Sequence, residues 1–273
     1  MSGYKDYVLY NKLPHPWCSG CGQGVIVHML GEAFSALKLD KTRIALVSGI
    51  GCFGRVDDYL DVNCLHVTHG RALPAATGVA LANPELTVLA AMGDGDGTTI
   101  GGNHLIHAAR RNVNVTAIIA NNYNYGQTGG QYSATTPEGS LTSTSPYGHV
   151  EDNFDICKLA EAAGASYVAR STSVHPHQMK TLIMEGINHR GFALIEVVAP
   201  CPTHYGRLNV GGSVSDIMMH MKQRCVPVGQ ARDMSEEALT DKIVTGCLVN
   251  RQRDDFATRY HRIIEAQKTG EEA

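Results

Sequence analysis

The chain has 273 residues, of which 43% are apolar and 18% charged, and 23 basic against 26 acidic side chains give a formal net charge of -3. This composition supplies a buried core and excludes a disordered, collagen-like or coiled-coil chain. Because positive charge is not in excess, the chain is not expected to bind nucleic acid.

Short apolar runs alternate with helix-length segments along most of the chain. The runs predict strands at Arg43–Val47, Leu86–Met92, Val115–Asn121, Ser166–Ala169 and Ala193–Val198. The intervening segments predict helices at Gln23–Leu37, Ala72–Ala82, Asn103–Arg111, Phe154–Ala163 and Pro176–Asn188. This alternation indicates an α/β fold with a mostly parallel sheet and helices on both faces. Ligands of such sheets bind beyond the carboxyl ends of the strands.

Two regions depart from this alternation. The segment Asn122–His149 is rich in Gly, Ser, Thr, Asn and Tyr and is too long for an ordinary connection, which favours a functional loop. The segment Cys201–Asp233 lacks clear periodicity and leads into a charged tail from Ser235 that we expect to be helical. We therefore divide the chain into an α/β domain, residues 1–200, and a C-terminal extension, residues 201–273.

The sequence carries no sign of export or membrane insertion. Met1–Lys12 mixes both charge signs without an apolar run, unlike a signal peptide. No run approaches the roughly 18 to 20 apolar residues that span a bilayer. We expect a soluble cytoplasmic protein without a membrane partner, whose eight cysteines are thiols or metal ligands rather than disulfides.

Two polar loops directly follow predicted strands. The first is Gly93-Asp94-Gly95-Asp96-Gly97, and the second begins with Asn121-Asn122-Tyr123-Asn124. Parallel strands would bring both loops to one crevice, where carboxylate and amide oxygens suit Mg²⁺ with phosphate oxygens. The glycines and the start of a helix near Gly102 would let a diphosphate approach the backbone. The alternative is that Gly-Asp-Gly only forms a tight turn.

Four cysteines lie in loops rich in Gly or Pro. Cys18 and Cys21 form a C-x-x-C motif, Cys52 follows the first predicted strand, and Cys201 follows the last. Four such thiolates suit zinc or an iron-sulfur cluster, and spacing does not choose between them. The other cysteines are interpreted as ordinary core or surface thiols, namely Cys64, Cys157, Cys225 and Cys247.

The pairing of Gly-Asp-Gly with Asn-Asn resembles the thiamin diphosphate motif. Together with Cys-Ser-Gly-Cys-Gly at 18–22, Ile-Gly-Cys at 50–52, His-Gly-Arg-Ala at 69–72 and Pro-Cys-Pro-Thr at 200–203, it makes the chain similar to the β subunits of 2-oxoacid:ferredoxin oxidoreductases over about residues 10–230. The resemblance implies a thiamin diphosphate-binding fold. It also implies oxidative decarboxylation of a 2-oxo acid, with coenzyme A taking the acyl group and ferredoxin the electrons.

The resemblance assigns residues to each cofactor. It implies that Asp94, Asn122 and Asn124, the last through its backbone carbonyl, ligate Mg²⁺. It also implies a 4Fe-4S cluster on Cys18, Cys21, Cys52 and Cys201, a role that redox-inert zinc could not fill. His69 and Arg71 are the candidate catalytic residues. We expect the thiamin diphosphate to contact Ile50, Gly51, His69, Gly93, Asp94, Gly95, Asp96, Asn122, Asn124, Gly126, Gln127 and Thr128.

Thiamin catalysis also needs a glutamate that no Glu of this chain matches in context. The resemblance implies that an α subunit supplies this Glu and most contacts to coenzyme A, so that the working unit is an αβ heterodimer or its dimer. The loop that follows Gln127 looks most like that of bacterial 2-oxoglutarate members. Some relatives have Lys where Gly129 stands, which leaves pyruvate and branched-chain 2-oxo acids open as substrates.

Two hypotheses from other classes remain at this stage. The chain could be a non-catalytic iron-sulfur or zinc protein, such as a redox sensor, in which case thiamin would be dispensable. It could also be a subunit of a non-oxidative thiamin decarboxylase or carboligase, which would need no cluster.

Overall fold

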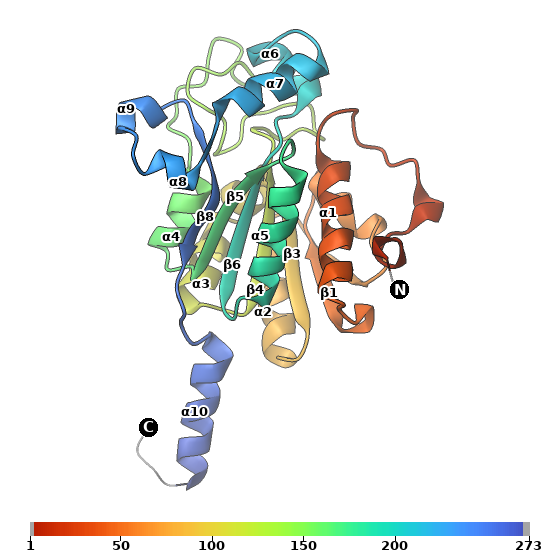
Figure 1. The fold of residues 1–273 in the computed structure, drawn as a ribbon, viewed down its shortest axis with the longest axis vertical. Coiled ribbons are helices and arrows are strands. Elements are labelled where there is room, and N and C mark those ends of the chain that lie inside the picture. The colour runs from red at the N-terminus through yellow and green to blue at the C-terminus, as the bar shows by residue number, and fades with distance from the viewer. Residues whose placement is uncertain (1–2, 270–273) are drawn as a thin grey trace.

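Eight strands form one sheet in a computed structural model that describes residues 3–269, in the order β2-β1-β3-β4-β6-β5-β8-β7 (Figure 1). The strands are β1 (Ile44–Ser48), β2 (Asn63–His66), β3 (Thr87–Gly93), β4 (Val115–Asn121), β5 (Tyr167–Thr172), β6 (Phe192–Val198), β7 (Cys225–Pro227) and β8 (Ile243–Asn250). The pairings from β2 through β5 are all parallel, whereas β8 runs antiparallel to β5 and β7 runs parallel to β8.

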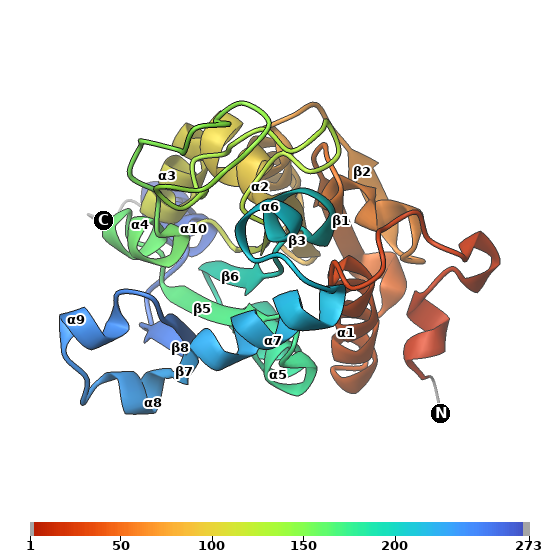
Figure 2. The ribbon, with the colours of Figure 1, turned by 90° about the horizontal axis from the view of Figure 1, so that it is seen from above.

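Helices cover both faces of this sheet. The α-helices of the described residues are α1 (Gln23–Ala36), α2 (Ala72–Ala82), α3 (Gly102–Arg111), α4 (Ile156–Ala162), α5 (Pro176–Asn188), α6 (Arg207–Asn209), α7 (Val214–Arg224), α8 (Val228–Ala231), α9 (Glu236–Leu239) and α10 (Phe256–Thr269). Helices α1 and α5 lie on one face, and α2, α3 and α4 lie on the other (Figure 2). The predicted mostly parallel sheet with helices on both faces is therefore confirmed.

The core consists of two apolar layers, one on each side of the sheet. Every residue of β4 and of β6 is buried, because helices pack against both faces of these central strands. This burial explains why the strands appear in the sequence as continuous apolar runs instead of alternating ones. The predicted bounds of β4, α2 and α5 agree with the structure to the residue.

The prediction of a helical tail from Ser235 onward is wrong for residues 243–250. These residues form β8, which pairs with β5 and extends the sheet beyond the predicted strands. The run Ile243-Val244-Thr245 has the β-branched side chains that favour a strand, and pairing with the otherwise open edge of β5 satisfies its backbone. Helix α10, farther along the tail, is the helical part and extends away from the body of the molecule (Figure 1).

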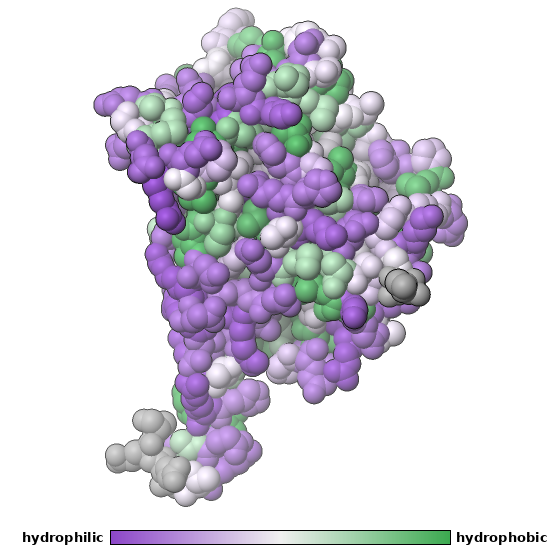
Figure 3. All heavy atoms as spheres, viewed as in Figure 1, coloured by the Kyte–Doolittle hydropathy of each residue, from purple (hydrophilic) through white to green (hydrophobic). Residues whose placement is uncertain are grey.

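The polar loop between β4 and α4 and the segment after β6 both lie at the carboxyl ends of the parallel strands (Figure 1). On the face shown in Figure 3 the surface is mainly hydrophilic, with small scattered apolar areas. Among residues 3–269, no helix combines the length and apolar character needed to cross a membrane.

Candidate active site

A cavity of about 70 Å³ lies where β1, β3 and β4 end. Its lining brings together all twelve residues predicted to contact the cofactor: Ile50, Gly51, His69, Gly93, Asp94, Gly95, Asp96, Asn122, Asn124, Gly126, Gln127 and Thr128. Three further residues, Cys52, Phe53 and Tyr125, complete it. A Cβ added at Gly51 or Gly93 would meet no atom within 4 Å, so the backbone there is open to a ligand.

Asp94 is the buried anion of this cavity, with 1% of its surface exposed. The Ser133 and Thr135 hydroxyls lie 2.5 Å and 2.7 Å from Oδ2 of Asp94. The backbone N–H of Asn122 donates to Oδ1 at 3.3 Å. All three partners are neutral, and burial raises the pKa of the Asp94 carboxyl. A cation at this carboxylate would offset the cost of burying its charge.

Asn122 and Asn124 place further oxygens beside this carboxylate. Oδ1 of Asn122 accepts the backbone N–H of Asn124 at 3.2 Å, so the two residues form a tight turn. The side-chain oxygen and nitrogen of Asn124 are both buried without a hydrogen-bond partner among the described residues. Buried polar atoms are normally paired, so the turn has unused capacity for a polar ligand.

Asp96 orients a histidine that also lines this cavity. Its Oδ1 lies 2.5 Å from His69 Nδ1 and accepts the Gly70 N–H at 2.6 Å. Gly49 makes room for the carboxylate, because a Cβ there would lie 1.8 Å from Asp96 Oδ2. Burial raises the pKa of the Asp96 carboxyl despite these two donors. With Nδ1 engaged, Nε2 is the His69 nitrogen left for a ligand.

The four predicted ligand cysteines line one second cavity, of about 330 Å³. The chain brings Cys18, Cys21 and Cys52 together with Cys201 there, although Cys201 lies far from them in the sequence. Burial, followed by the charges of the neighbouring cysteines, raises the pKa of Cys52 to about 11, and burial likewise raises that of Cys21 to about 11. The structure therefore assembles four thiols that a metal would have to deprotonate on binding.

No three of these four sulfur atoms lie within 4.8 Å of one another. In residues 3–269, only Asp155, Cys157 and Glu196 bring three such ligand atoms within 4.8 Å of one another. Four thiolates on one tetrahedral zinc ion, at Zn–S distances of about 2.3 Å, would lie roughly 3.8 Å apart. The wider arrangement fits a larger group than a single ion.

The two cavities share a wall made of Cys52, Asn122, Gly126 and Gln127. The Cys201 N–H donates to the Asn122 carbonyl at 3.2 Å, which joins the two loops directly. A Cβ on Gly126 would lie 3.3–3.5 Å from the side chains of Asn124, Asn122 and Cys52, so glycine permits this close approach. A group in one cavity would therefore be a neighbour of a group in the other.

Arg71 is the one predicted site residue outside both cavity linings. It is exposed at the start of α2, and its guanidinium donates to the Gly70 carbonyl at 3.2 Å. Sequence reasoning missed Ser133 and Thr135, although both lie in the polar loop that it singled out. It also missed Trp17, whose indole N–H donates to the Cys52 carbonyl at 2.7 Å.

Comparison with known proteins gives a consistent result. Residues 49–197 match the family described as "Thiamine pyrophosphate enzyme, C-terminal TPP binding domain". The chain is 45% identical to the 2-oxoglutarate synthase subunit KorB of Methanocaldococcus jannaschii, over 96% of this chain and 97% of that protein. It is 50% identical to the subunit of the same name from Archaeoglobus fulgidus, over 81% of this chain and 80% of that one.

A solved structure supports the same grouping. A chain in the 2-oxoglutarate:ferredoxin oxidoreductase from Magnetococcus marinus, with 2-oxoglutarate, coenzyme A and succinyl-CoA bound, superposes with a TM-score of 0.86 at 32% sequence identity. The match covers 100% of this chain and 92% of that chain. The likeness thus includes the C-terminal segment, which lies outside the matched family domain.

Proposed function

This chain belongs to the thiamine pyrophosphate enzymes and, among them, to the family of the 2-oxoglutarate synthase KorB subunits, and from that premise we propose that it is the thiamin-binding β subunit of a 2-oxoglutarate:ferredoxin oxidoreductase. The observation that carries the proposal is the shared wall between the Asp94 cavity and the four-cysteine cavity. A redox enzyme needs such closeness between the group that loses electrons and the group that takes them.

The Asp94 cavity fits Mg²⁺ and a diphosphate. Asp94 offers a buried carboxylate with only neutral partners, and Asn122 and Asn124 add the hard oxygens that Mg²⁺ prefers. The open backbone at Gly93 and Gly51 lets phosphate oxygens approach closely. Thiamin diphosphate would supply the carbanion chemistry of decarboxylation, and the chain would hold its diphosphate end.

The four-cysteine cavity fits a 4Fe-4S cluster. Its ligands would be Cys18, Cys21, Cys52 and Cys201, and their spread favours a cluster over zinc. Iron-sulfur clusters carry electrons, whereas zinc does not. Cys52 and Gly126 line both cavities, so these residues of the chain would separate the two groups and hold them as neighbours.

The remaining residues would orient the reacting groups. Asp96 holds the His69 ring with Nε2 available for a hydrogen bond to the diphosphate or to the substrate carbonyl. Ile50 would pack against the cofactor as an apolar support, while Arg71 stays a prediction as a partner for substrate charge.

The chain requires an α subunit to complete the site. No glutamate is among the described residues that line the Asp94 cavity, and its volume of about 70 Å³ is far below the roughly 300 Å³ of a typical small ligand site. We infer that the α subunit supplies the catalytic Glu, covers the cofactor and contributes the coenzyme A contacts.

The substrate that we propose is 2-oxoglutarate, oxidised with coenzyme A to succinyl-CoA and CO₂, with ferredoxin as the acceptor. Two KorB relatives are named for 2-oxoglutarate, and the structural neighbour holds 2-oxoglutarate, coenzyme A and succinyl-CoA. These names favour 2-oxoglutarate over pyruvate and branched-chain 2-oxo acids.

The test is anaerobic electron paramagnetic resonance of the chain purified with its α partner. We expect a reduced-cluster signal with 2-oxoglutarate and coenzyme A, a much weaker one with pyruvate or branched-chain 2-oxo acids, and none in Asp94→Ala. Cys52→Ser should lose iron, whereas the matched control Cys64→Ser, at an exposed thiol outside both cavities, should keep it. An iron-free complex, or a cluster that no 2-oxo acid reduces, would overturn the proposal.

A further inference from the structure

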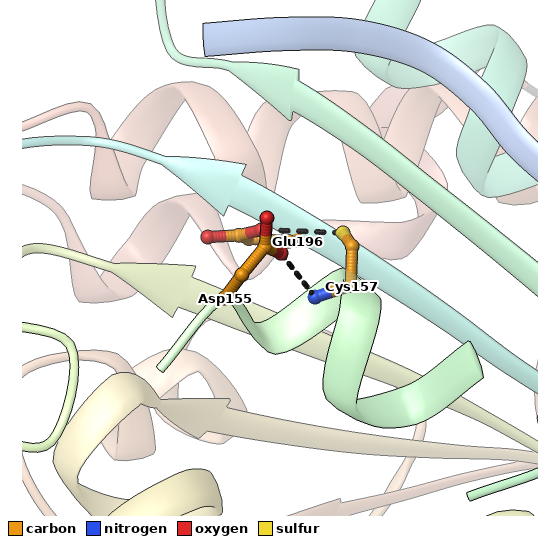
Figure 4. A group of neighbouring side chains, drawn as sticks. All are labelled: Asp155, Cys157 and Glu196. Atoms are coloured by element: carbon orange, nitrogen blue, oxygen red, sulfur yellow. Dashed lines mark hydrogen bonds between the residues drawn. The ribbon is translucent and has the colours of Figure 1, made fainter. Parts of the chain in front are cut away.

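A largely buried charged network contacts the end of β4, next to the Asp94 cavity, through Asn121. It contains Asp155, which precedes α4, Cys157 in the first turn of α4, and Glu196 of β6, all turned toward one another (Figure 4). Arg170 of β5 donates to Glu196 through Nε at 2.6 Å and to Asp155 through Nη2 at 2.5 Å. The arginine already donates to both carboxylates, so we interpret this group as an ion-pair network and assign no metal to it.

Both oxygens of the Glu196 carboxylate accept hydrogen bonds. Oε2 accepts from Arg170 and, at 3.2 Å, from the Cys157 thiol, whose pKa burial raises so that it keeps its proton. Oε1 accepts the side-chain Nδ2–H of Asn121 at 2.8 Å. An ionised carboxylate can only accept, so Glu196 determines which way the Asn121 amide faces.

The orientation of the Asn121 amide determines which of its atoms faces Thr135 and Tyr123, next to the proposed cofactor site. With Nδ2 on Glu196, Oδ1 of Asn121 faces the Thr135 hydroxyl at 3.0 Å, and the same hydroxyl lies 2.7 Å from Asp94 Oδ2. Oδ1 also accepts the backbone N–H of Tyr123 at 3.2 Å, at a residue with a left-handed φ of 64°. If the Asn121 amide were flipped, its NH₂ group would face the backbone N–H of Tyr123, and two donors would meet.

We propose that Glu196, held by Arg170, is a positioning residue for the Mg²⁺–thiamin diphosphate site, acting through the Asn121 amide on the turn that carries Asn122 and Asn124. The inference rests on the proposed function, because it assumes that this turn and Asp94 hold the cofactor. The network connects Arg170 of β5 and Glu196 of β6 to Asn121, the last residue of β4. It therefore anchors the turn that follows β4 to the central strands of the sheet.

The first test exchanges the polarity of the Glu196–Asn121 pair. In Glu196→Gln, whichever way the new amide turns, its NH₂ meets a donor of Arg170 or of Asn121. In Asn121→Asp, a second carboxylate faces Glu196. In the double variant, the glutamine can accept from Arg170 and donate to the aspartate, which accepts from Tyr123. The total charge of the double variant equals that of the wild type.

The measurement is calorimetric binding of thiamin diphosphate, at fixed Mg²⁺, to the αβ complex freed of cofactor. We expect each single variant to raise the Kd by about 10- to 100-fold, as for lost outer partners of metal ligands, and the double variant to bind more tightly than either. The matched control is Asp255→Asn, which breaks another buried carboxylate–arginine pair, with Arg190, away from the site. It should bind as the wild type does.

Each outcome decides between the claims. Single variants that bind like the wild type, or a double variant no better than the singles, would overturn the positioning role while leaving the proposed function intact. A wild-type complex that binds no thiamin diphosphate would overturn the proposed function itself. Should the single variants fail to assemble, Arg170→Lys serves instead. It keeps the charge but loses the fork between Glu196 and Asp155, and an unchanged Kd there would refute the inference.

Discussion

Trp17→Phe is expected to loosen the cysteine loops without removing a cysteine. The indole N–H of Trp17 donates to the Cys52 carbonyl at 2.7 Å, and its ring packs on Tyr59 with centroids 4.9 Å apart. The side chain is 9% exposed and lines the four-cysteine cavity. It therefore ties the segment that carries Cys18 to the loop that carries Cys52.

The magnitude follows from one lost hydrogen bond and a smaller ring. A buried acceptor left without its partner costs about 1–3 kcal/mol. Because the Cys52 carbonyl is only partly buried, we expect the free energy of opening the loop to fall by about 1–2 kcal/mol in the variant. One to two kcal/mol corresponds to roughly a 5- to 30-fold change in an equilibrium. Iron should therefore leave the variant complex roughly 5- to 30-fold faster.

The assay is the rate at which a chelator removes iron from the anaerobic αβ complex. Tyr59→Phe is the matched control, because it removes a hydroxyl from the ring that packs on Trp17 while leaving the bond to Cys52 in place. Equal iron-release rates in Trp17→Phe, Tyr59→Phe and wild type would refute the claim that the indole closes the cysteine loops.

Two other changes test the site and the C-terminal helix. Asp96→Asn should lower kcat by about 10- to 100-fold, the value of one charged hydrogen bond, because His69 Nδ1 loses its carboxylate acceptor. Steady-state kinetics should measure this change, and a kcat within about twofold of the wild-type value would contradict it. Burial raises the pKa of Asp255, but bonds from Thr258 and Arg190 outweigh it and leave the pKa below its ordinary value. Its ionised form therefore stabilises the start of α10, and that stabilisation should be lost as pH falls below about 4. Hydrogen exchange in α10 should show this acid loss in wild type but not in Asp255→Asn, and equal profiles would contradict it.

Much of the fold could be predicted because its central strands are buried on both faces. The run Val115–Asn121 could be assigned from its apolar character alone, and α2 and α5 from their length and composition. Strand β2 was missed because Asn63–His66 is exposed along its whole length and carries no apolar pattern. Its strand conformation comes from backbone pairing with β1 at the edge of the sheet.

The site was partly predictable for a geometric reason. Carboxyl ends of parallel strands share one edge, so the loops after β3 and β4 had to meet, and the residues in them could be named in advance. Ser133 and Thr135 could not, because a long loop has no periodicity that tells which hydroxyl turns back to Asp94. Glu196 could not either, because nothing in a buried strand marks one acid as the partner of a distant asparagine.

The sequence by itself therefore determined which residues could do the chemistry: the Gly-Asp-Gly and Asn-Asn loops, the four cysteines in flexible loops, and the alternation that builds a parallel sheet. Only the tertiary structure decided how they combine. It set the cysteine cavity against the Asp94 cavity through Gly126 and Asn122, and it placed the Arg170–Glu196 pair behind Asn121. Local composition reports what a side chain can bind, whereas distance and orientation depend on contacts between segments far apart in the chain.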